Sequence, residues 1–227
     1  MTKYFEVLDR CPLFYHLSEQ DLPLMLDCLE AKVVCYKAEE VLIAEGDPAG
    51  SVGIVLSGAV RIVRDDYWGN RSIVADIGPS ELFGESFACA GLDAIPVSVI
   101  AARDVEVMLI DCMKLTRSYS HACVFHQQMI QNLLMILARK NLLFHQKIEV
   151  TSKRTAREKL TAYLLMQAKG NHSGSFEILY NRQELADYLE VERSGLSVEI
   201  GKLVKQGFIE VDGKKFHIIK AMDGQCP

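Results

Sequence analysis

Polar and basic side chains near the C-terminal end have types and spacings that suit contact with DNA. Arg193 begins a segment of helical periodicity, where an arginine can donate two hydrogen bonds to the edge of one guanine. Lys214 and Lys215 follow an Asp-Gly pair, and lysines at such a tip can contact phosphates. We expect the DNA contacts to come from Arg182, Arg193, Ser194, Ser197, Val198, Lys202, Lys214 and Lys215.

Two helices must position most of these side chains. Asn181 can cap a first helix, and Glu184, three residues on, can reach back to it as in a capping box. A second helix is expected after a turn at residues 190–192. Its apolar stripe consists of Leu196, Ile200 and Leu203. Two helices joined by a tight turn are typical of a helix-turn-helix, which places its second helix in the major groove of DNA.

A strand, a turn and a second strand follow the two helices. Residues 208–211 and 214–219 have strand-like composition, and Asp212-Gly213 between them predicts a two-residue type I′ turn. A helix-turn-helix followed by a hairpin is a winged helix. Residues 151–227, which include a further helix over about residues 153–169, are therefore expected to form a winged-helix DNA-binding domain.

Short strands punctuated by glycines dominate residues 31–111. The expected strands are residues 33–36, 41–44, 52–56, 60–63, 72–77, 97–101 and 105–110. Short strands at such close spacing are typical of an antiparallel barrel or sandwich. The fold class is therefore predicted to be α+β, with residues 1–120 forming the β domain.

One long amphipathic helix is predicted over about residues 122–150, well beyond the roughly 11–12 residues usual in globular proteins. Such a helix can lie along its own β domain or pair with the same helix of a second subunit, and we expect it to do both. The residues expected along its dimerising face are Phe125, Met129, Leu133, Ile136, Lys140 and Leu143. Residues 121–150 are therefore assigned as a dimerisation helix, with a hinge near residues 150–153.

The composition argues against several classes of protein. No apolar run among the 227 residues is long enough to span a membrane, and the N-terminus has no signal-peptide pattern, which predicts a cytoplasmic protein without a membrane partner. The seven cysteines include no C-x-x-C pair, so neither a disulfide framework nor a zinc site is indicated. Residues 1–149 hold 13 basic and 20 acidic side chains (−7), whereas residues 150–227 hold 12 and 10 (+2). The more basic part is therefore the one expected to meet nucleic acid.

Three motifs give nearly the whole chain a resemblance to the CRP/FNR family of bacterial transcription regulators. They are Glu45-Gly46-Asp47 followed by the run from Ile54 to Arg61, Leu82-Phe83-Gly84-Glu85-Ser86 before a short helix, and the C-terminal segments RQELADYL and ERSGLS. The resemblance implies an effector-sensing β-roll like those that bind cyclic nucleotides, a long dimerising helix and a winged-helix reader. It also implies a homodimer that binds palindromic promoter DNA and contacts RNA polymerase.

The residues around Glu85 depart from the cyclic-nucleotide pattern. In members that bind a cyclic nucleotide, an Arg-Ser pair follows across a short helix and its arginine holds the phosphate, but here the matching pair is Pro96-Val97. A buried phosphate without that guanidinium would lack a counter-charge, so cAMP is not the expected effector. The expected effector pocket consists of Phe83, Gly84, Glu85, Ser86, Phe87, Pro96, Val97, Phe125 and Met129. Because this lining is largely apolar, it favours an uncharged or aromatic effector of unknown identity.

Other cofactors of the family are not indicated by the sequence. Iron–sulfur members carry an N-terminal cysteine cluster, and only Cys11 and Cys28 occur in that region here. Cys89, His121 and His126 are the scattered candidates for a haem ligand. Neither an iron–sulfur cluster nor haem is therefore expected.

Two other classes of function compete with a DNA-binding regulator. A cupin-type metalloenzyme would share the strand pattern, but it needs clustered histidines, and residues 31–111 contain none. The second is a sensor or interaction module with weakened or lost DNA binding. Glu190 and Val198, which stand where many relatives have glycine and arginine, and the acidic Glu192 suggest this alternative. No Ser/His/Asp or Cys/His arrangement with interpretable spacing is present, so no enzyme activity is expected.

Overall fold

The computed structural model describes residues 2–18, 20–116 and 124–220 of the chain. The chain forms two compact units, Met1–Asn141 and Leu142–Pro227. The boundary between them falls inside one long helix, α5 (Val124–Thr151), so the last turns of this helix group with the C-terminal unit.

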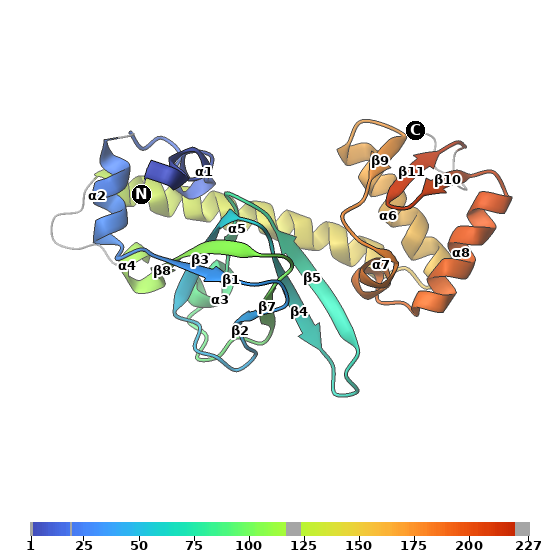
Figure 1. Cartoon of the computed structure of the whole chain (residues 1–227), viewed down its shortest axis with the longest axis horizontal. Coiled ribbons are helices and arrows are strands. Elements are labelled where there is room, and N and C mark those ends of the chain that lie inside the picture. The colour runs from blue at the N-terminus through green and yellow to red at the C-terminus, as the bar shows by residue number, and fades with distance from the viewer. Residues whose placement is uncertain (1, 19, 117–123, 221–227) are drawn as a thin grey trace. The chain divides into compact units, whose positions relative to one another are not determined.

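The N-terminal unit contains two four-stranded antiparallel sheets with short helices around them (Figure 1). The helices are η1 (Thr2–Tyr4), α1 (Phe5–Asp9), η2 (Pro12–Phe14), α2 (Asp21–Cys28), α3 (Glu85–Cys89) and α4 (Cys112–Thr116). The strands are β1 (Lys32–Tyr36), β2 (Val41–Ile43), β3 (Ser51–Ser57), β4 (Val60–Asp65), β5 (Arg71–Ile77), β6 (Leu82–Phe83), β7 (Ser98–Ala101) and β8 (Val105–Asp111). One sheet has the strand order β1-β8-β3-β6 and the other β2-β7-β4-β5. This is the antiparallel β-roll that the resemblance implied, and all seven expected strands are present.

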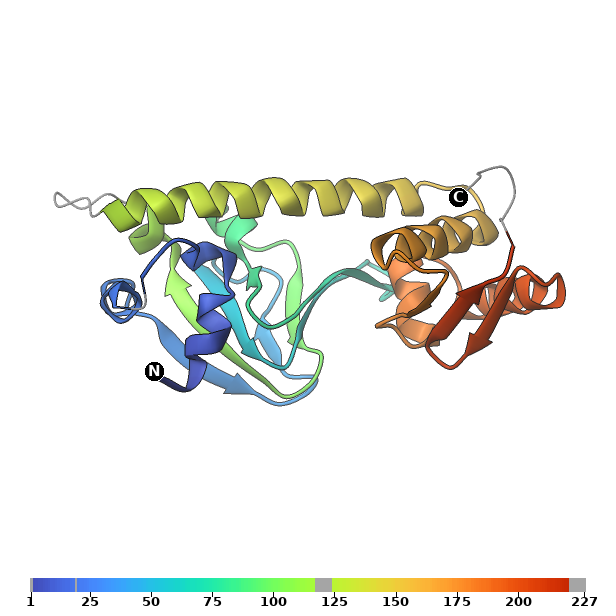
Figure 2. The ribbon, with the colours of Figure 1, turned by 90° about the horizontal axis from the view of Figure 1, so that it is seen from above.

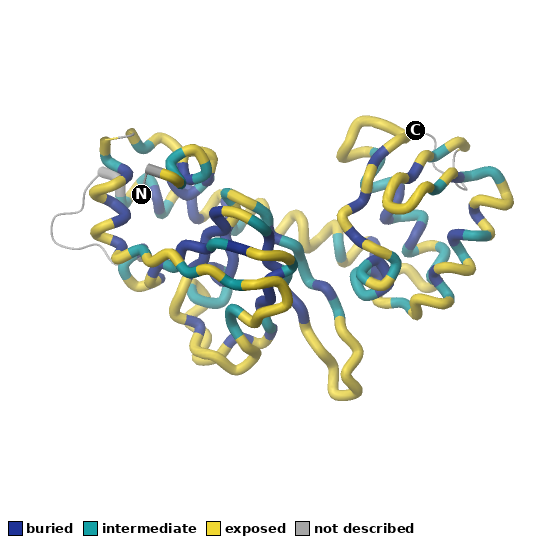
Figure 3. The backbone as a smooth tube through the Cα atoms, in the orientation of Figure 1, coloured by how far each residue is buried: buried dark blue, intermediate teal, exposed yellow. Residues whose placement is uncertain are grey.

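Strand β3 is buried on both faces because a separate core packs on each side of its sheet. Val52, Ile54 and Leu56 join the core shared with the helices, whereas Val55 points into the space between the two sheets. Successive side chains of a strand point to opposite faces, which explains this division. Figure 3 shows the contrast between the buried middle of the roll and the exposed tip between β4 and β5. The strand β6, only two residues long, was not predicted.

The first half of α5 lies along the roll and is held there by both packing and hydrogen bonds (Figure 2). Met129, Leu133 and Ile136 belong to the core between α5 and the first sheet. Asn132 is fully buried, and its Nδ2 donates to the carbonyls of Leu13 and Tyr15 at 2.9 Å each. A buried amide with two backbone partners fixes one face of α5 toward the N-terminal segment.

The C-terminal unit is a helical group with a three-stranded sheet. Its elements are α6 (Ala156–Gly170), β9 (Ser175–Glu177), α7 (Arg182–Leu189), α8 (Arg193–Lys205), β10 (Ile209–Asp212) and β11 (Lys215–Ile218), and the strand order is β10-β11-β9. Thr155 caps α6 in a capping box with Glu158, so this helix begins slightly later than predicted. No described helix is long and apolar enough to cross a membrane.

Candidate DNA-reading surface and ligand site

A capping box starts α7, as the sequence predicted. The side chain of Asn181 accepts hydrogen bonds from the backbone amides of Gln183 and Glu184, at 2.9 and 3.0 Å. Glu184 Oε2 in turn accepts from the Asn181 amide at 2.7 Å. The first orphan amides of α7 are thereby satisfied, and the helix start is fixed in place.

The turn between α7 and α8 contains a residue with a left-handed backbone and accepts two hydrogen bonds from a lysine of α6. Glu190 ends α7 with φ +54, a left-handed conformation that glycine adopts more easily. Lys159 of α6 donates from its Nζ to the carbonyls of Leu189 and Glu190, at 3.1 and 3.2 Å. These contacts neutralise the negative end of α7 and hold the turn. Nothing in the sequence pattern distinguished Lys159 from other surface lysines.

Helix α8 buries one face and presents the other. Its buried residues are Leu196, Ile200 and Leu203, as predicted, and its exposed residues include Arg193, Ser194, Ser197, Val198 and Lys202. In the part of the chain that the structure describes, the Arg193 guanidinium forms no ion pair with Glu190 or Glu192. Ser197 Oγ donates to the Arg193 carbonyl at 2.9 Å, and Lys202 pairs with Glu199 at 2.6 Å. The exposed face thus offers a free guanidinium at its first turn.

The hairpin after α8 forms, but its turn is shifted by one residue from the prediction. Asp212 pairs with Lys215, so the two central residues are Gly213 and Lys214 rather than Asp212 and Gly213. Only Gly213 has a positive φ, +58, as in a turn with glycine at the first central position. The predicted type I′ turn is therefore wrong. Lys214 reaches back to the Leu179 carbonyl, and Lys215 is exposed on the strand.

Arg182, at the start of α7, packs on the hairpin. Its guanidinium carbon lies 5.2 Å from the ring centroid of Phe216, and burial lowers the pKa of the arginine from its ordinary value. This stacking leaves the guanidinium only partly exposed, so Arg182 contributes to holding the hairpin as well as being a candidate for phosphate contact.

In the roll, the carboxylate of Glu85 is already paired. Gly84 adopts φ +79 and starts α3, and Glu85 follows it with only 1% of its surface exposed. Lys140 of α5 places its Nζ 2.8 Å from Glu85 Oε1 and also donates to the Leu82 carbonyl. Within the described residues, the buried Glu85 Oε2 has no hydrogen-bond partner. A buried carboxylate with one unused acceptor is a candidate for contact with a ligand donor.

The residues predicted for the effector pocket are divided between two cores. Phe83 and Val97 lie in the core between the two sheets, and Phe87 packs against it. Met129 lies in the other core, with the helices. Pro96 is exposed, and Ser86 is half-buried with its Oγ 3.2 Å from Glu85. The side chain of Phe125 lies outside the described residues.

The Phe83 ring fills the interior of the roll beside a glycine. A Cβ built on Gly53 would lie 2.0 Å from the Phe83 Cζ atom, well inside van der Waals contact. The ring therefore occupies the space that a side chain at residue 53 would take.

Helix α5 carries a second apolar stripe, which overlaps the face that covers the roll at Leu137. Leu134 and Ile148 are exposed to 62% and 61%, and Phe144 to 37%. The stripe, which we term the outer stripe, consists of Ile130, Leu134, Leu137, Asn141, Phe144 and Ile148, at alternating steps of four and three residues. Of the residues predicted for the dimerising face, Met129, Leu133 and Ile136 are buried on the roll, Lys140 pairs with Glu85, and Leu143 is exposed off this stripe.

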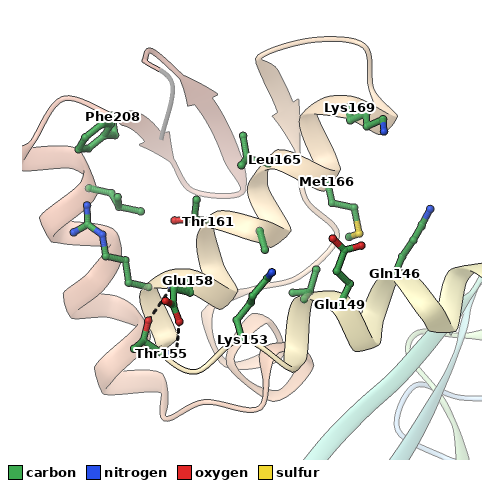
Figure 4. A pocket seen from close by; sticks show the side chains of 14 residues that line it. Gln146, Glu149, Lys153, Thr155, Glu158, Thr161, Leu165, Met166, Lys169 and Phe208 are labelled. Carbon is green, nitrogen blue, oxygen red and sulfur yellow. Dashed lines mark hydrogen bonds between the residues drawn. The ribbon is translucent and has the colours of Figure 1, made fainter. Parts of the chain in front are cut away.

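A cavity of about 800 Å³ lies within the C-terminal unit (Figure 4). Polar and apolar side chains both contribute to its lining, which consists of Gln146, Glu149, Val150, Lys153, Thr155, Arg157, Glu158, Thr161, Ala162, Leu165, Met166, Lys169, Leu203 and Phe208. None of these residues was predicted to contact an effector. Among the described residues, no three His, Cys, Asp or Glu side chains converge as metal ligands would.

Comparisons with known proteins match both units. Residues 33–135 match the model of the cyclic nucleotide-binding domain, and residues 158–224 match that of the Crp-like helix-turn-helix domain. The chain is 28% identical to the transcriptional activator protein anr of Pseudomonas aeruginosa over 194 residues, 82% of this chain and 76% of that protein. It is 26% identical to the cyclic AMP receptor protein of Thermus thermophilus over 203 residues, 88% of each. The solved structure of FixK2 from Bradyrhizobium japonicum shares the fold, with a TM-score of 0.65 at 22% identity over 84% of this chain and 93% of that one.

Proposed function

Because the chain belongs to the CRP/FNR family of transcription regulators, we propose that it works as a homodimer that reads two-fold symmetric promoter DNA under control of a small-molecule effector. The observation that supports a dimer most directly is the outer stripe of α5. Apolar residues at alternating steps of three and four form the seam of a two-stranded coiled coil. Exposed Leu134 and Ile148 would otherwise stay in water, so pairing with a second copy offers them burial.

The one polar residue of the outer stripe favours a parallel, in-register pair. Asn141 is exposed and stands at a seam position between Leu137 and Phe144. In a parallel pair it would meet Asn141 of the partner subunit, and two amides can then hydrogen-bond across the seam. A single asparagine at such a position fixes register at some cost in stability.

Two leucines of α5 provide a matched test of the dimer. Leu134 and Leu142 are exposed to 62% and 64%, but only Leu134 belongs to the outer stripe. Leu134→Glu should convert the dimer to a monomer in light scattering at micromolar concentration, because a charge would be buried in the seam. Leu142→Glu should leave the dimer intact. A wild-type monomer, or equal dissociation of both variants, would contradict the proposal.

The exposed face of α8 is proposed to enter the major groove. Arg193 at its first turn is the base-reading candidate, Ser194, Ser197, Val198 and Lys202 lie along the same face, and Lys214, Lys215 and Arg182 are candidates for phosphate contact. Activators of this family contact RNA polymerase, which is the expected protein partner, and a regulator of transcription is expected to act in the cytoplasm.

For the effector, we propose a small molecule without a phosphate that donates a hydrogen bond to Glu85. Lys140 already supplies the carboxylate with a cation, and Pro96 and Val97 offer no counter-charge for an anion. The unused Oε2 of Glu85 supports a donor on the ligand. Phe83, Phe87 and Val97, the apolar residues expected to line this pocket, lie in or against the core between the two sheets, which favours an uncharged or aromatic molecule.

Cyclic AMP is the informative probe, since one relative is named a cyclic AMP receptor protein. Titration calorimetry of the full chain should show no binding of cAMP at micromolar concentration. A micromolar or tighter dissociation constant that Glu85→Gln abolishes would overturn this part of the proposal.

We also propose that neither an iron–sulfur cluster nor haem is the effector. Cys11 is fully buried, and burial raises the pKa of its thiol to about 12, which disfavours the thiolate that a cluster would need. Cys28, at the end of α2, is exposed. Aerobically and anaerobically purified protein should therefore lack the visible absorption of either group.

A further inference from the structure

Two cysteines from separate segments of the chain meet beside the roll. Cys89 is the last residue of α3, and Cys112 is the first residue of α4. The two short helices pack against each other. The Sγ atoms lie 3.8 Å apart although the residues are 23 positions apart in the sequence. The function proposed above gives neither thiol a role.

We propose that Cys89 and Cys112 form an oxidisable dithiol that closes to a disulfide during sustained exposure to a peroxide. A disulfide bond is about 2.05 Å long, so the sulfurs must approach by about 1.8 Å. Rotation of the Cys89 side chain can supply such a movement, because that residue is exposed. Cys112 is only 4% exposed, so a peroxide in solution reaches Cys89 first.

The reaction balances with hydrogen peroxide as the oxidant. The Cys89 thiolate attacks one peroxide oxygen, the O–O bond breaks, and hydroxide leaves while a sulfenic acid forms on Sγ. The Cys112 thiolate then attacks that sulfur, the S–O bond breaks, and the S–S bond forms with loss of a second hydroxide. Both hydroxides take up the protons released by the two thiols. The net change is oxidation of two thiols and reduction of one peroxide to two waters.

The environment of the two cysteines should make their disulfide slow to form and slow to be reduced. Although Cys89 is exposed as a residue, its thiol is partly removed from water, which raises its pKa to about 12, with the neighbouring Cys112 as the next cause. Burial also raises the pKa of Cys112. Because the thiolate is the reacting species, the rate of disulfide formation should increase about tenfold for each unit by which the pH is raised, as long as the pH stays below the pKa of Cys89. A thiol of high pKa is also a poor leaving group, so the closed bridge resists exchange with other thiols. The site therefore suits prolonged rather than brief oxidation.

Formation of the disulfide would affect α3, the helix that contains the buried Glu85. Glu85 and Cys89 are the first and last residues of α3, one helical turn apart. A bridge to α4 would restrict α3, and with it the position of the Glu85–Lys140 pair.

Trypsin separates the two cysteines, which makes the bridge directly measurable. Residues 72–103 contain Cys89 alone, and residues 104–114 contain Cys112 alone. The full-length protein would be treated with hydrogen peroxide for hours, its remaining thiols blocked with iodoacetamide, and the digest analysed by mass spectrometry. We expect these two peptides to appear linked, with two hydrogens lost, and to separate on reduction with dithiothreitol. The number of titratable thiols in denaturant should fall by two from the seven of the chain.

Variants identify the partners. Cys112→Ser should abolish the linked peptide, and Cys89→Ser, at an exposed position that tolerates the change, should do the same. Cys35→Ser, also at an exposed cysteine, should leave it at the wild-type level. Cys89 recovered as a sulfinic acid, or linked to any other cysteine while Cys112 remains free, would overturn the proposal.

Discussion

A charged residue of the roll and a charged residue of α8 differ in burial and in ion pairing. In the roll, Glu85 is 1% exposed and its carboxylate meets Lys140 of the same chain at 2.8 Å. On α8, Arg193 is exposed, and among the described residues its guanidinium forms no ion pair with the adjacent glutamates. Both residues lie in motifs that carry the resemblance to the family. A retained motif therefore does not imply an equally open site: one charge is satisfied from within, and the other remains available to a partner.

Replacing Lys140 should have the largest effect on stability, because its partner Glu85 is buried and the pair on α8 is exposed. Lys140→Met leaves the Glu85 carboxylate buried without a cation, and the free energy of unfolding should fall by about 3 kcal/mol. Lys202→Met breaks the exposed pair with Glu199 and should change stability far less. Urea unfolding followed by circular dichroism measures both. The double variant Lys140→Met with Glu85→Gln should recover much of the loss, and equal stability of the Lys140→Met and Lys202→Met proteins would contradict the contrast.

The same glycine-to-alanine change should have opposite signs in the two regions. Gly53→Ala drives a methyl group into the Phe83 ring and should destabilise the protein by roughly 1–3 kcal/mol. Gly201→Ala lies in α8, where no atom comes within 4 Å of the new Cβ, and should stabilise by roughly 0.8 kcal/mol through helix propensity. Thermal unfolding of both variants tests the sign. Loss of stability for Gly201→Ala would mean that α8 is less open than described.

At the open site, Arg193 and Lys215 should separate base reading from phosphate contact. Arg193→Ala should remove roughly 1–3 kcal/mol of discrimination at one base pair of each half-site. Lys215→Ala should weaken binding to all sequences alike and reduce the slope of log affinity against log salt by about one. Fluorescence anisotropy with single-base variants of an operator distinguishes the two patterns. Unchanged base preference in Arg193→Ala would place the reading residue elsewhere.

A further small effect is predicted for the turn that precedes the reading helix α8. Glu190→Gly relieves a left-handed backbone at φ +54 and should stabilise the protein by about 1 kcal/mol. Glu192→Gly makes the same change at φ −62, where no such strain exists, and should give no gain. Thermal melts of the two variants compare them directly, and equal shifts would remove backbone strain as the cause.

Features governed by local physics could be predicted from the sequence. The Asn181–Glu184 capping box, the buried stripe of α8 and seven of the eight strands of the roll follow from the local residue pattern. The hairpin turn was misplaced by one residue because an Asp-Gly pair fits either of two registers, and only strand pairing decides between them.

Features governed by tertiary contacts could not be predicted. Helix α5 carries two overlapping apolar stripes, one with Leu133 and one with Leu134, and periodicity does not say which covers the roll. Lys140 follows the spacing of the buried stripe, yet its partner Glu85 is distant in the sequence. The clamp of Lys159 on the end of α7 is likewise visible only once α6 and α7 are packed together.

Selection of operators from random DNA by the purified wild-type protein tests the central claim, a dimer that reads symmetric DNA, most directly. A homodimer with an open reading face should enrich an inverted repeat whose half-site centres lie about 10–10.5 base pairs, or a multiple of this, apart. Enrichment of a single half-site, or of no sequence at all, would contradict the account and would favour an interaction module that has lost DNA binding.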